Sequence, residues 1–199
     1  MLSPGVPARG RESMAMTLVY LVQHGEKQPI PGDPELTKLG RGHAARTGQW
    51  LRNAGLGAVY SSPARRAWQT AEIIADVVGL SVVADARLRE RANWDATQPI
   101  ADFLGDWAHS THDRDFVPRC GDSSCTAAER LRSFIVELAT APAPVAAATH
   151  GGVTVDLLRT LLGDQALPAD LVTDGMPSCA ITTLDGLNVV DIASTRHLT

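Results

Sequence analysis

The chain of 199 residues lacks any apolar run approaching the roughly 18 residues that a membrane-spanning helix requires. Cysteine is scarce, and Cys120, Cys125 and Cys179 are odd in number and lack the paired spacing of a zinc site. Basic residues are not in excess, because 18 Lys+Arg stand against 22 Asp+Glu for a formal net charge of −4. We therefore expect a cytoplasmic protein with free thiols and with neither nucleic acid nor a membrane as partner.

What is present is enough apolar material for a substantial core. Hydrophobic residues make up 44% of the chain, charged residues 20%, and the mean hydropathy is −0.04. The length suits one domain, which we place at residues 17–199. Residues 1–16 contain Pro, Gly and Arg but no apolar run of signal-peptide length, and a disordered extension is expected there.

Short β-prone runs alternate with segments of helical periodicity along the chain. Strands are expected at 17–22, 58–61, 81–84 and 144–149, and a hairpin at 179–192 around Asp185-Gly186. One helix is expected from a Thr37 N-cap to Gly55, and the next from a Ser62 N-cap with Pro63 at the first helical position. Two more are expected over 127–138 and from Gly151 to Leu162. Residues 88–122 are expected to form short helices and loops. This order predicts an α/β fold, a three-layer α/β/α sandwich whose central sheet is mostly parallel with an antiparallel edge strand.

Polar residues follow three of the predicted strands. His24, Ser61-Ser62 and His150 stand at strand ends, and ligands of open α/β sheets bind beyond the carboxyl ends of the strands. Arg66 falls in the first turn of the next helix, and Gly151-Gly152 opens another helix whose free N–H groups suit an anion. Together these residues predict a phosphate-handling site.

The same residue types can carry out phosphoryl transfer. A neutral imidazole is a competent nucleophile toward phosphorus and forms a phosphohistidine that water later cleaves. A second histidine, if protonated, can stabilise the equatorial oxygens alongside Arg66. Glu90 is the candidate acid that protonates the leaving alcohol and then activates water.

From about Leu18 to Leu184, the sequence resembles the histidine phosphatase superfamily, the phosphoglycerate mutase-like proteins. Five motifs in the family's order carry the resemblance. They are Gln23-His24-Gly25-Glu26 followed by Leu36-Thr37-Lys38-Leu39-Gly40, then Ser61-Ser62-Pro63 with Arg66, Leu88-Arg89-Glu90-Arg91, Gly121-Asp122-Ser123 with Arg130, and Thr149-His150-Gly151-Gly152.

The resemblance implies a role for each matched residue. His24 would be the phosphorylated nucleophile, Glu90 the proton donor, and Arg66 and His150 the core of a phosphate pocket that Gln23, Gly25, Lys27 and Gly151 complete. It implies a phosphoric monoester hydrolase of the histidine acid phosphatase type, which acts on a small-molecule phosphate ester without a cofactor or a metal.

Gln23 is the departure from the pattern, because the family has arginine before the first histidine. Glutamine keeps a donor but loses the charge, and a hydrogen bond to a charged group is worth roughly 1.5–3 kcal/mol. An uncompensated loss would cost on the order of 10- to 100-fold in rate. Lys27, three residues after His24, either returns a cation to the pocket or is a solvated loop lysine.

Two further groups of residues could have a function, one as metal ligands and one as aromatic residues near the site. His109, His112, Asp113, Cys120 and Cys125 invite a metal site, but their spacing matches no closed zinc site. The aromatic residues of the excursion between Arg91 and Arg119 either close a lid or line a cleft, or simply pack on the sheet; they are Trp94, Phe103 and Trp107.

Three functions remain open at this level. The first is hydrolysis of a small phosphorylated metabolite, and the second is a weakly active or non-catalytic phosphoester-binding domain, which Gln23 would favour. A phosphomutase is the third, disfavoured by the short region between Glu90 and Gly121. No residue pattern identifies the substrate or the oligomeric state.

Overall fold

The computed structural model describes residues 17–199, so the expected extension at 1–16 lies outside the described residues. A six-stranded sheet with the order β3-β2-β4-β1-β5-β6 forms the centre. The strands are β1 Leu18–Gln23, β2 Ala58–Ser61, β3 Val82–Ala84, β4 Val145–Thr149, β5 Ile181–Asp185 and β6 Asn188–Ser194. The first four are parallel, and β5 and β6 add an antiparallel hairpin at one edge, which confirms the predicted sheet.

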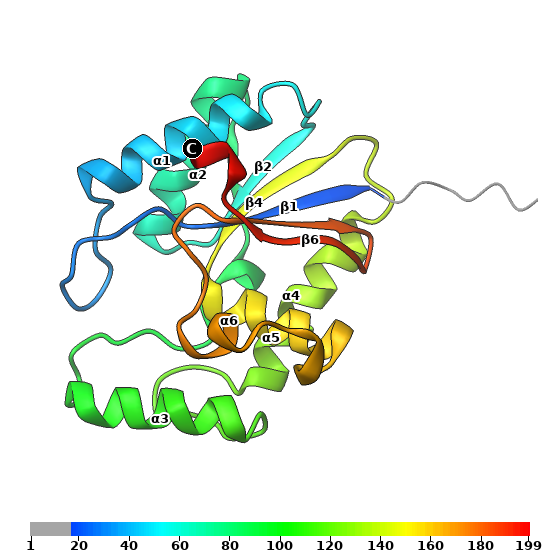
Figure 1. Cartoon of the computed structure of the whole chain (residues 1–199). Coiled ribbons are helices and arrows are strands. Elements are labelled where there is room, and N and C mark those ends of the chain that lie inside the picture. The colour runs from blue at the N-terminus through cyan, green and yellow to red at the C-terminus, as the bar shows by residue number, and fades with distance from the viewer. Residues whose placement is uncertain (1–16) are drawn as a thin grey trace, which may run out of the picture.

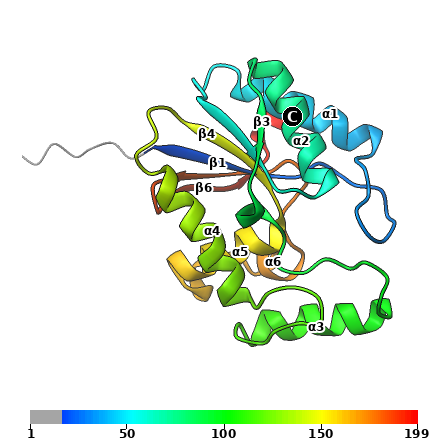
Figure 2. The ribbon, with the colours of Figure 1, turned by 180° about the vertical axis from the view of Figure 1, so that it is seen from behind.

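Helices cover both faces of this sheet (Figures 1 and 2). They are α1 Lys38–Leu51 and α2 Arg65–Val78 on one face, and α4 Ser124–Leu138, α5 Gly151–Leu162 and the short α6 Ala169–Thr173 on the other. Each face has its own apolar cluster, one around Ile74 and Val59 and one around Phe134 and Leu157. The predicted three-layer sandwich is therefore the fold, while the assignment of 17–199 to a single domain stays a prediction.

Serine and threonine caps fix where two of the helices begin. Thr37 Oγ1 accepts a hydrogen bond from the Gly40 N–H (3.0 Å), as predicted for an N-cap. Ser123 Oγ accepts from the Thr126 N–H (3.2 Å), so α4 begins at Ser124, three residues before the predicted start.

The predicted start of α2 at Ser62 and Pro63 is wrong. The helix begins at Arg65, with Ala64 at the N-cap position. The Ser62 hydroxyl accepts hydrogen bonds from the Ala64 N–H (3.3 Å) and from the His150 ring (2.8 Å), outside the helix. The Arg65 N–H donates to the carboxylate of Asp33 (2.7 Å), a residue of the preceding loop. A carboxylate thus satisfies this helix end from outside the local sequence, which local patterns do not reveal.

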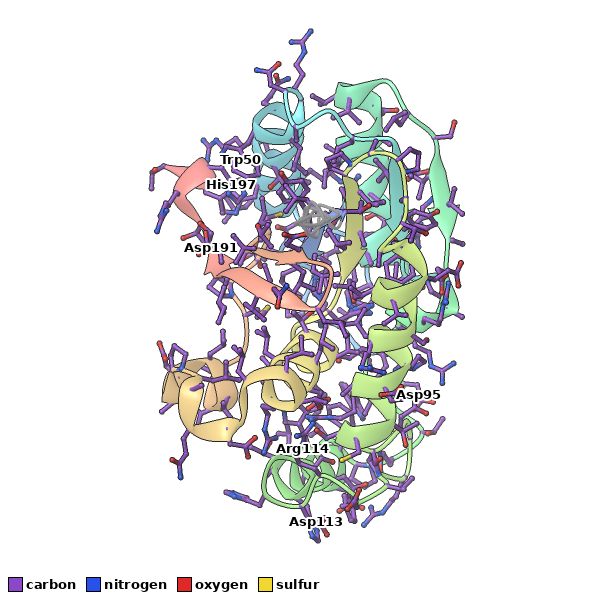
Figure 3. All side chains as sticks on the ribbon, turned by 90° about the vertical axis from the view of Figure 1, so that its right-hand side faces the viewer. Trp50, Asp95, Asp113, Arg114, Asp191 and His197 are labelled. Atoms are coloured by element: carbon purple, nitrogen blue, oxygen red, sulfur yellow. The ribbon has the colours of Figure 1, made fainter. Side chains whose placement is uncertain are left out.

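Residues 88–122 hold one long helix, α3 Ile100–His112, where short helices were expected. It stands apart from the sandwich (Figure 1), and its buried residues are Asp106 and Ser110. Arg114, which follows α3, donates to the Asp156 carbonyl (3.0 Å) and to Thr160 Oγ1 (2.6 Å) of α5. Figure 3 shows Arg114 between these two parts of the molecule, so one side chain ties the excursion to the sandwich.

Candidate active site

Strand register brings the two histidines to the same edge of the sheet. β1 and β4 are parallel neighbours in which Gln23 faces Thr149, and the His24 N–H donates to the Thr149 carbonyl (3.1 Å). His24 and His150 each follow the last residue of their strand, and their ring centroids lie 5.2 Å apart. Parallel pairing in register is thus what makes the two His-Gly steps neighbours.

Arg66 bridges the two rings. Its Nε–H donates to His24 Nε2 and its Nη2–H to His150 Nδ1, both at 3.1 Å. The side chain is nearly fully buried, and its second position in α2 directs it to the sheet edge. Since guanidinium only donates, both contacted ring nitrogens are acceptors.

These contacts determine which nitrogen of each ring carries the proton. The His24 Nδ1–H donates to the Gly25 carbonyl (2.8 Å), which leaves the Nε2 lone pair directed at Arg66. The His150 Nε2–H donates to Ser62 Oγ (2.8 Å), which leaves Nδ1 as the acceptor. His24 therefore presents its unprotonated nitrogen to the guanidinium, the group that binds phosphate oxygens best.

Both histidines are neutral at pH 7. Burial, with the charge of Arg66, lowers the pKa of His24 to about 3. The pKa of His150 is held well below its ordinary value by the same two causes, with a contribution from His24. His150 is therefore neutral in the resting state, and not protonated as the sequence had suggested for the second histidine. Arg66 supplies the positive charge between the two rings.

Glu90 lies across the start of α5. Its Oε1 accepts from the Arg91 and Val153 N–H groups (2.7 and 2.8 Å), and its Oε2 accepts from the Gly152 N–H (3.0 Å). The Gly152 N–H thus donates to the Glu90 carboxyl group and not to a phosphate, while phosphate binding by Gly151 stays a prediction. A methyl group at Gly152 would lie 2.6 Å from both Glu90 Oε1 and the Trp107 ring, so glycine permits this close approach.

Arg130 holds the segment that carries Glu90. Its Nη1 donates to the carbonyls of Arg87 (2.7 Å) and Arg89 (2.9 Å), and its Nη2 pairs with Asp122 (3.0 Å). Arg130 belongs to one of the sequence motifs, but the sequence did not predict its role. Its acceptors are backbone carbonyl groups, which a pattern of side chains does not reveal. Its position makes it a clamp on the backbone next to Glu90.

Gly25 serves packing in this structure. Its N–H donates to Thr70 Oγ1 (3.0 Å), and the expected role of Gly25 in phosphate binding stays a prediction. A methyl group at Gly25 would lie 2.7 Å from the Gly40 carbonyl oxygen, so the loop and α1 approach closely only because both residues are glycine.

Gln23 and Lys27 both reach the neighbourhood of the reactive ring. Gln23 Nε2 lies 3.4 Å from His24 Nε2, while its Oε1 is buried without a partner in the described part of the chain. Lys27 lines the same cavity as His24 and Arg66, and partial burial together with Arg66 lowers its pKa. The lysine is therefore placed where a phosphate ligand could meet it.

Two recesses open from this cluster. One, of about 330 Å³, is lined by His24, Lys27, Arg66 and Glu90 and continues along α3. Trp94, Phe103 and Trp107 line its far part, which favours a cleft over simple packing. The other recess contains Arg66, Glu90 and His150 together with Asp33, Asp95 and Asp122.

Residues 17–199 contain no group of three or more His, Cys, Asp or Glu side chains arranged to hold a metal ion.

The strand-end histidines, the bridging arginine and the capping glutamate lie within a region that matches one family model. Residues 19–186 match the histidine phosphatase superfamily, branch 1. The chain belongs to the histidine phosphatase superfamily. This places it among phosphatase- and mutase-type enzymes and confirms the resemblance found in its motifs.

Relatives of this member of the histidine phosphatase superfamily are named both as mutases and as phosphatases. A probable phosphoglycerate mutase of Erwinia tasmaniensis is 33% identical over 187 residues, with 85% of each chain covered. The mycobacterial glucosyl-3-phosphoglycerate phosphatase, solved with inorganic phosphate, superposes with a TM-score of 0.72 at 26% identity over 92% of this chain and 100% of that one. YhfR of Bacillus stearothermophilus gives 0.70 at 25% identity with the same coverage. No described helix has the length and apolar character needed to cross a bilayer.

Proposed function

We propose that the protein is a phosphomonoesterase that hydrolyses a small phosphorylated metabolite through a phosphohistidine on His24. One observation carries the proposal: the lone pair of His24 Nε2 points at the guanidinium of Arg66, inside a cavity that Glu90 also lines. A nucleophile, a phosphate ligand and an acid thus face one space. The phosphatase name of the mycobacterial structure cited above agrees with this chemistry.

In the first step, the phosphate group of the ester displaces the imidazoles as acceptor of the Arg66 N–H groups. His24 Nε2 then attacks phosphorus, the N–P bond forms and the P–O bond to the alcohol breaks. The leaving oxygen takes a proton from Glu90. Because Oε1 already accepts two N–H groups and Oε2 one, Oε2 has room to hold that proton.

In the second step, the Glu90 carboxylate takes a proton from water, whose oxygen attacks the phosphohistidine. The N–P bond breaks, inorganic phosphate leaves, and Glu90 is again protonated for the next cycle. The Nδ1–H···O bond to Gly25 keeps the His24 ring oriented through both steps and stabilises the positive charge on the phosphorylated ring. Before the ester binds, His150 orients Arg66 by accepting from its Nη2.

Brief incubation with a ³²P-labelled ester, followed by denaturation, tests the proposal. The wild type should carry an acid-labile label, and His24→Ala should carry none and release no phosphate. His112→Ala, at an exposed position of α3, is the matched control and should label like the wild type. Hydrolysis by His24→Ala at the wild-type rate would refute the nucleophile, and absence of label and turnover across many esters would favour a binding domain.

A mutase is the second candidate because the Erwinia relative bears that name. Incubation with 3-phosphoglycerate separates the two reactions. Release of inorganic phosphate supports hydrolysis, whereas formation of 2-phosphoglycerate without release supports the mutase.

A further inference from the structure

The recess that runs along α3 changes character with distance from His24. Its charged lining residues, Lys27, Arg66 and Glu90, belong to the phosphate end. The remainder of the wall is largely apolar and comes from the loop before α1, the segment before α3, and α3 itself. Its large apolar members are Ile30, Trp94, Ile100, Phe103, Leu104 and Trp107.

Several of these side chains are exposed although they are large and apolar. Ile30 is 52% exposed, Ile100 45% and Leu104 56%. Isolated exposed apolar residues are common on protein surfaces, but these three line one recess that ends at the reactive histidine. The apolar surface is therefore placed where the alcohol part of a bound ester would lie.

The two tryptophans offer the substrate little polarity. Trp94 Nε1–H already donates to the Gln98 carbonyl (2.9 Å). The Arg91 guanidinium lies 4.1 Å from the centroid of the Trp107 ring and pairs with buried Asp156 (2.9 Å). With the Trp94 N–H already bonded and the Arg91 guanidinium stacked on Trp107, what the two rings offer a ligand is mainly apolar surface.

The second recess would not favour an anionic alcohol either. Its arginines are already paired, Arg89 with Asp122 (3.0 Å) and Arg91 with Asp156. Asp33 and Asp95 add further negative charge to its lining. A carboxylate on the substrate would thus meet like charges there and apolar side chains in the other recess.

From this distribution we infer that the substrate is a phosphate monoester of an apolar alcohol that carries no second acidic group. The inference rests on the proposed function and specifies the alcohol part of that substrate. It sets this chain apart from proteins named for phosphoglycerates, because the carboxylate of such a substrate would meet only arginines that already pair with a carboxylate. In the lining of the two recesses these pairs are Arg66 with Asp33, Arg89 with Asp122, and Arg91 with Asp156.

A comparison of kcat/KM for three phosphate esters of aliphatic alcohols tests the inference. Hexyl phosphate, glycerol 3-phosphate and 3-phosphoglycerate all release an aliphatic alcohol and differ mainly in the polarity of that alcohol. We expect kcat/KM for hexyl phosphate to exceed the other two at least 10-fold, the range that apolar pocket contacts supply. Equal or higher kcat/KM for 3-phosphoglycerate would overturn the inference while leaving the phosphatase intact.

Variants of the wall locate the effect. Leu104→Gln and Ile30→Gln should each lower kcat/KM for hexyl phosphate roughly five- to tenfold and change that for glycerol 3-phosphate less than twofold. Leu39→Gln is the matched control, because Leu39 lies on α1, outside both recesses, and is 54% exposed. It should change neither value, and an equal loss on both esters in the wall variants would contradict the assignment.

A binding measurement keeps the two proposals separable if no ester is hydrolysed. The proposed function would then have failed, and calorimetry on the wild type with hexylphosphonate and with phosphonoacetate tests the wall alone. Tighter binding of hexylphosphonate supports the apolar subsite, and equal or weaker binding overturns it.

Discussion

Arg66 is nearly buried between two neutral imidazoles, and both of its ring contacts use lone pairs that a phosphate would replace. The motif that this chain resembles is expected to place a second cation before the first histidine, and Gln23 stands there in this chain. Its unpartnered Oε1 can accept but contributes no positive charge. The strength of phosphate binding therefore depends on Arg66 and on any help from Lys27.

Lys27→Ala should weaken inhibition by inorganic phosphate about fivefold, since an exposed charge pair at about 4 Å is worth about 1 kcal/mol. The measurement is the Ki of phosphate against ester hydrolysis, at low salt. Lys38→Ala, which removes the chain's other lysine at an exposed position of α1, is the control. An unchanged Ki in Lys27→Ala would mean that this lysine is simply solvated.

The depressed pKa of His24 also predicts how stability depends on pH. The unfolded imidazole titrates near 6.5 and the folded one near 3, so between these values the unfolded state binds more protons. Stability therefore falls as the pH falls through this window, by about 1.4 kcal/mol per unit. Urea unfolding at pH 7 and pH 5 should show the wild type losing about 2 kcal/mol more than His24→Asn. Parallel losses in the two proteins would contradict the assigned shift.

At the scale of elements, the start of α5 joins helix formation to chemistry. Glu90 caps the helix through the Gly152 and Val153 N–H groups and is also the proposed acid. Sequence patterns predicted β4, the His150 turn and α5, because these depend on local periodicity and glycine placement. They did not predict the cap, nor the Asp33 cap of α2, because the partners are far apart in sequence and only the folded chain brings them together.

Gly152→Ala should lower kcat at least 10-fold, because the new methyl group would displace Glu90 or Trp107 from contact distance. Gly42→Ala on α1 is the matched control, since among the described residues its methyl group meets no atom within 4 Å. The control should keep full activity and raise the free energy of unfolding by about 0.5–1 kcal/mol. Wild-type kcat in Gly152→Ala would show that Glu90 need not sit at the helix end.

At the scale of the whole molecule, the layered sandwich carries the excursion between Arg91 and Arg119, whose helix α3 buries polar residues. The mostly parallel sheet with its antiparallel edge, the helix layers and the cluster of His24, Arg66 and His150 were predictable. They follow from apolar periodicity and from residues placed at strand ends, which are local features of the sequence. The position of α3 was not predictable, because its buried residues are the polar Asp106 and Ser110 and its anchors are ion pairs and carbonyl contacts. Apolar periodicity carries no information about such anchors.

Hydrogen exchange should reflect this difference. Amides of α3 should exchange faster than those of α4 and α5, because α3 buries few apolar contacts. Mass spectrometry of exchange with and without hexylphosphonate measures both the rates and the protection expected on binding. Exchange of α3 as slow as that of α5 would contradict the prediction.

The separation between the sandwich and α3 bears on how this enzyme could change. The wall residues of α3 and of the 27–35 loop contribute no strand to the sheet and stand outside its two main apolar clusters. Substitutions such as those at Ile30 or Leu104 can therefore alter the accepted alcohol at little cost to folding. A mutant library confined to this wall, selected on esters of graded polarity, should yield new specificities while the phosphoryl-transfer apparatus remains untouched.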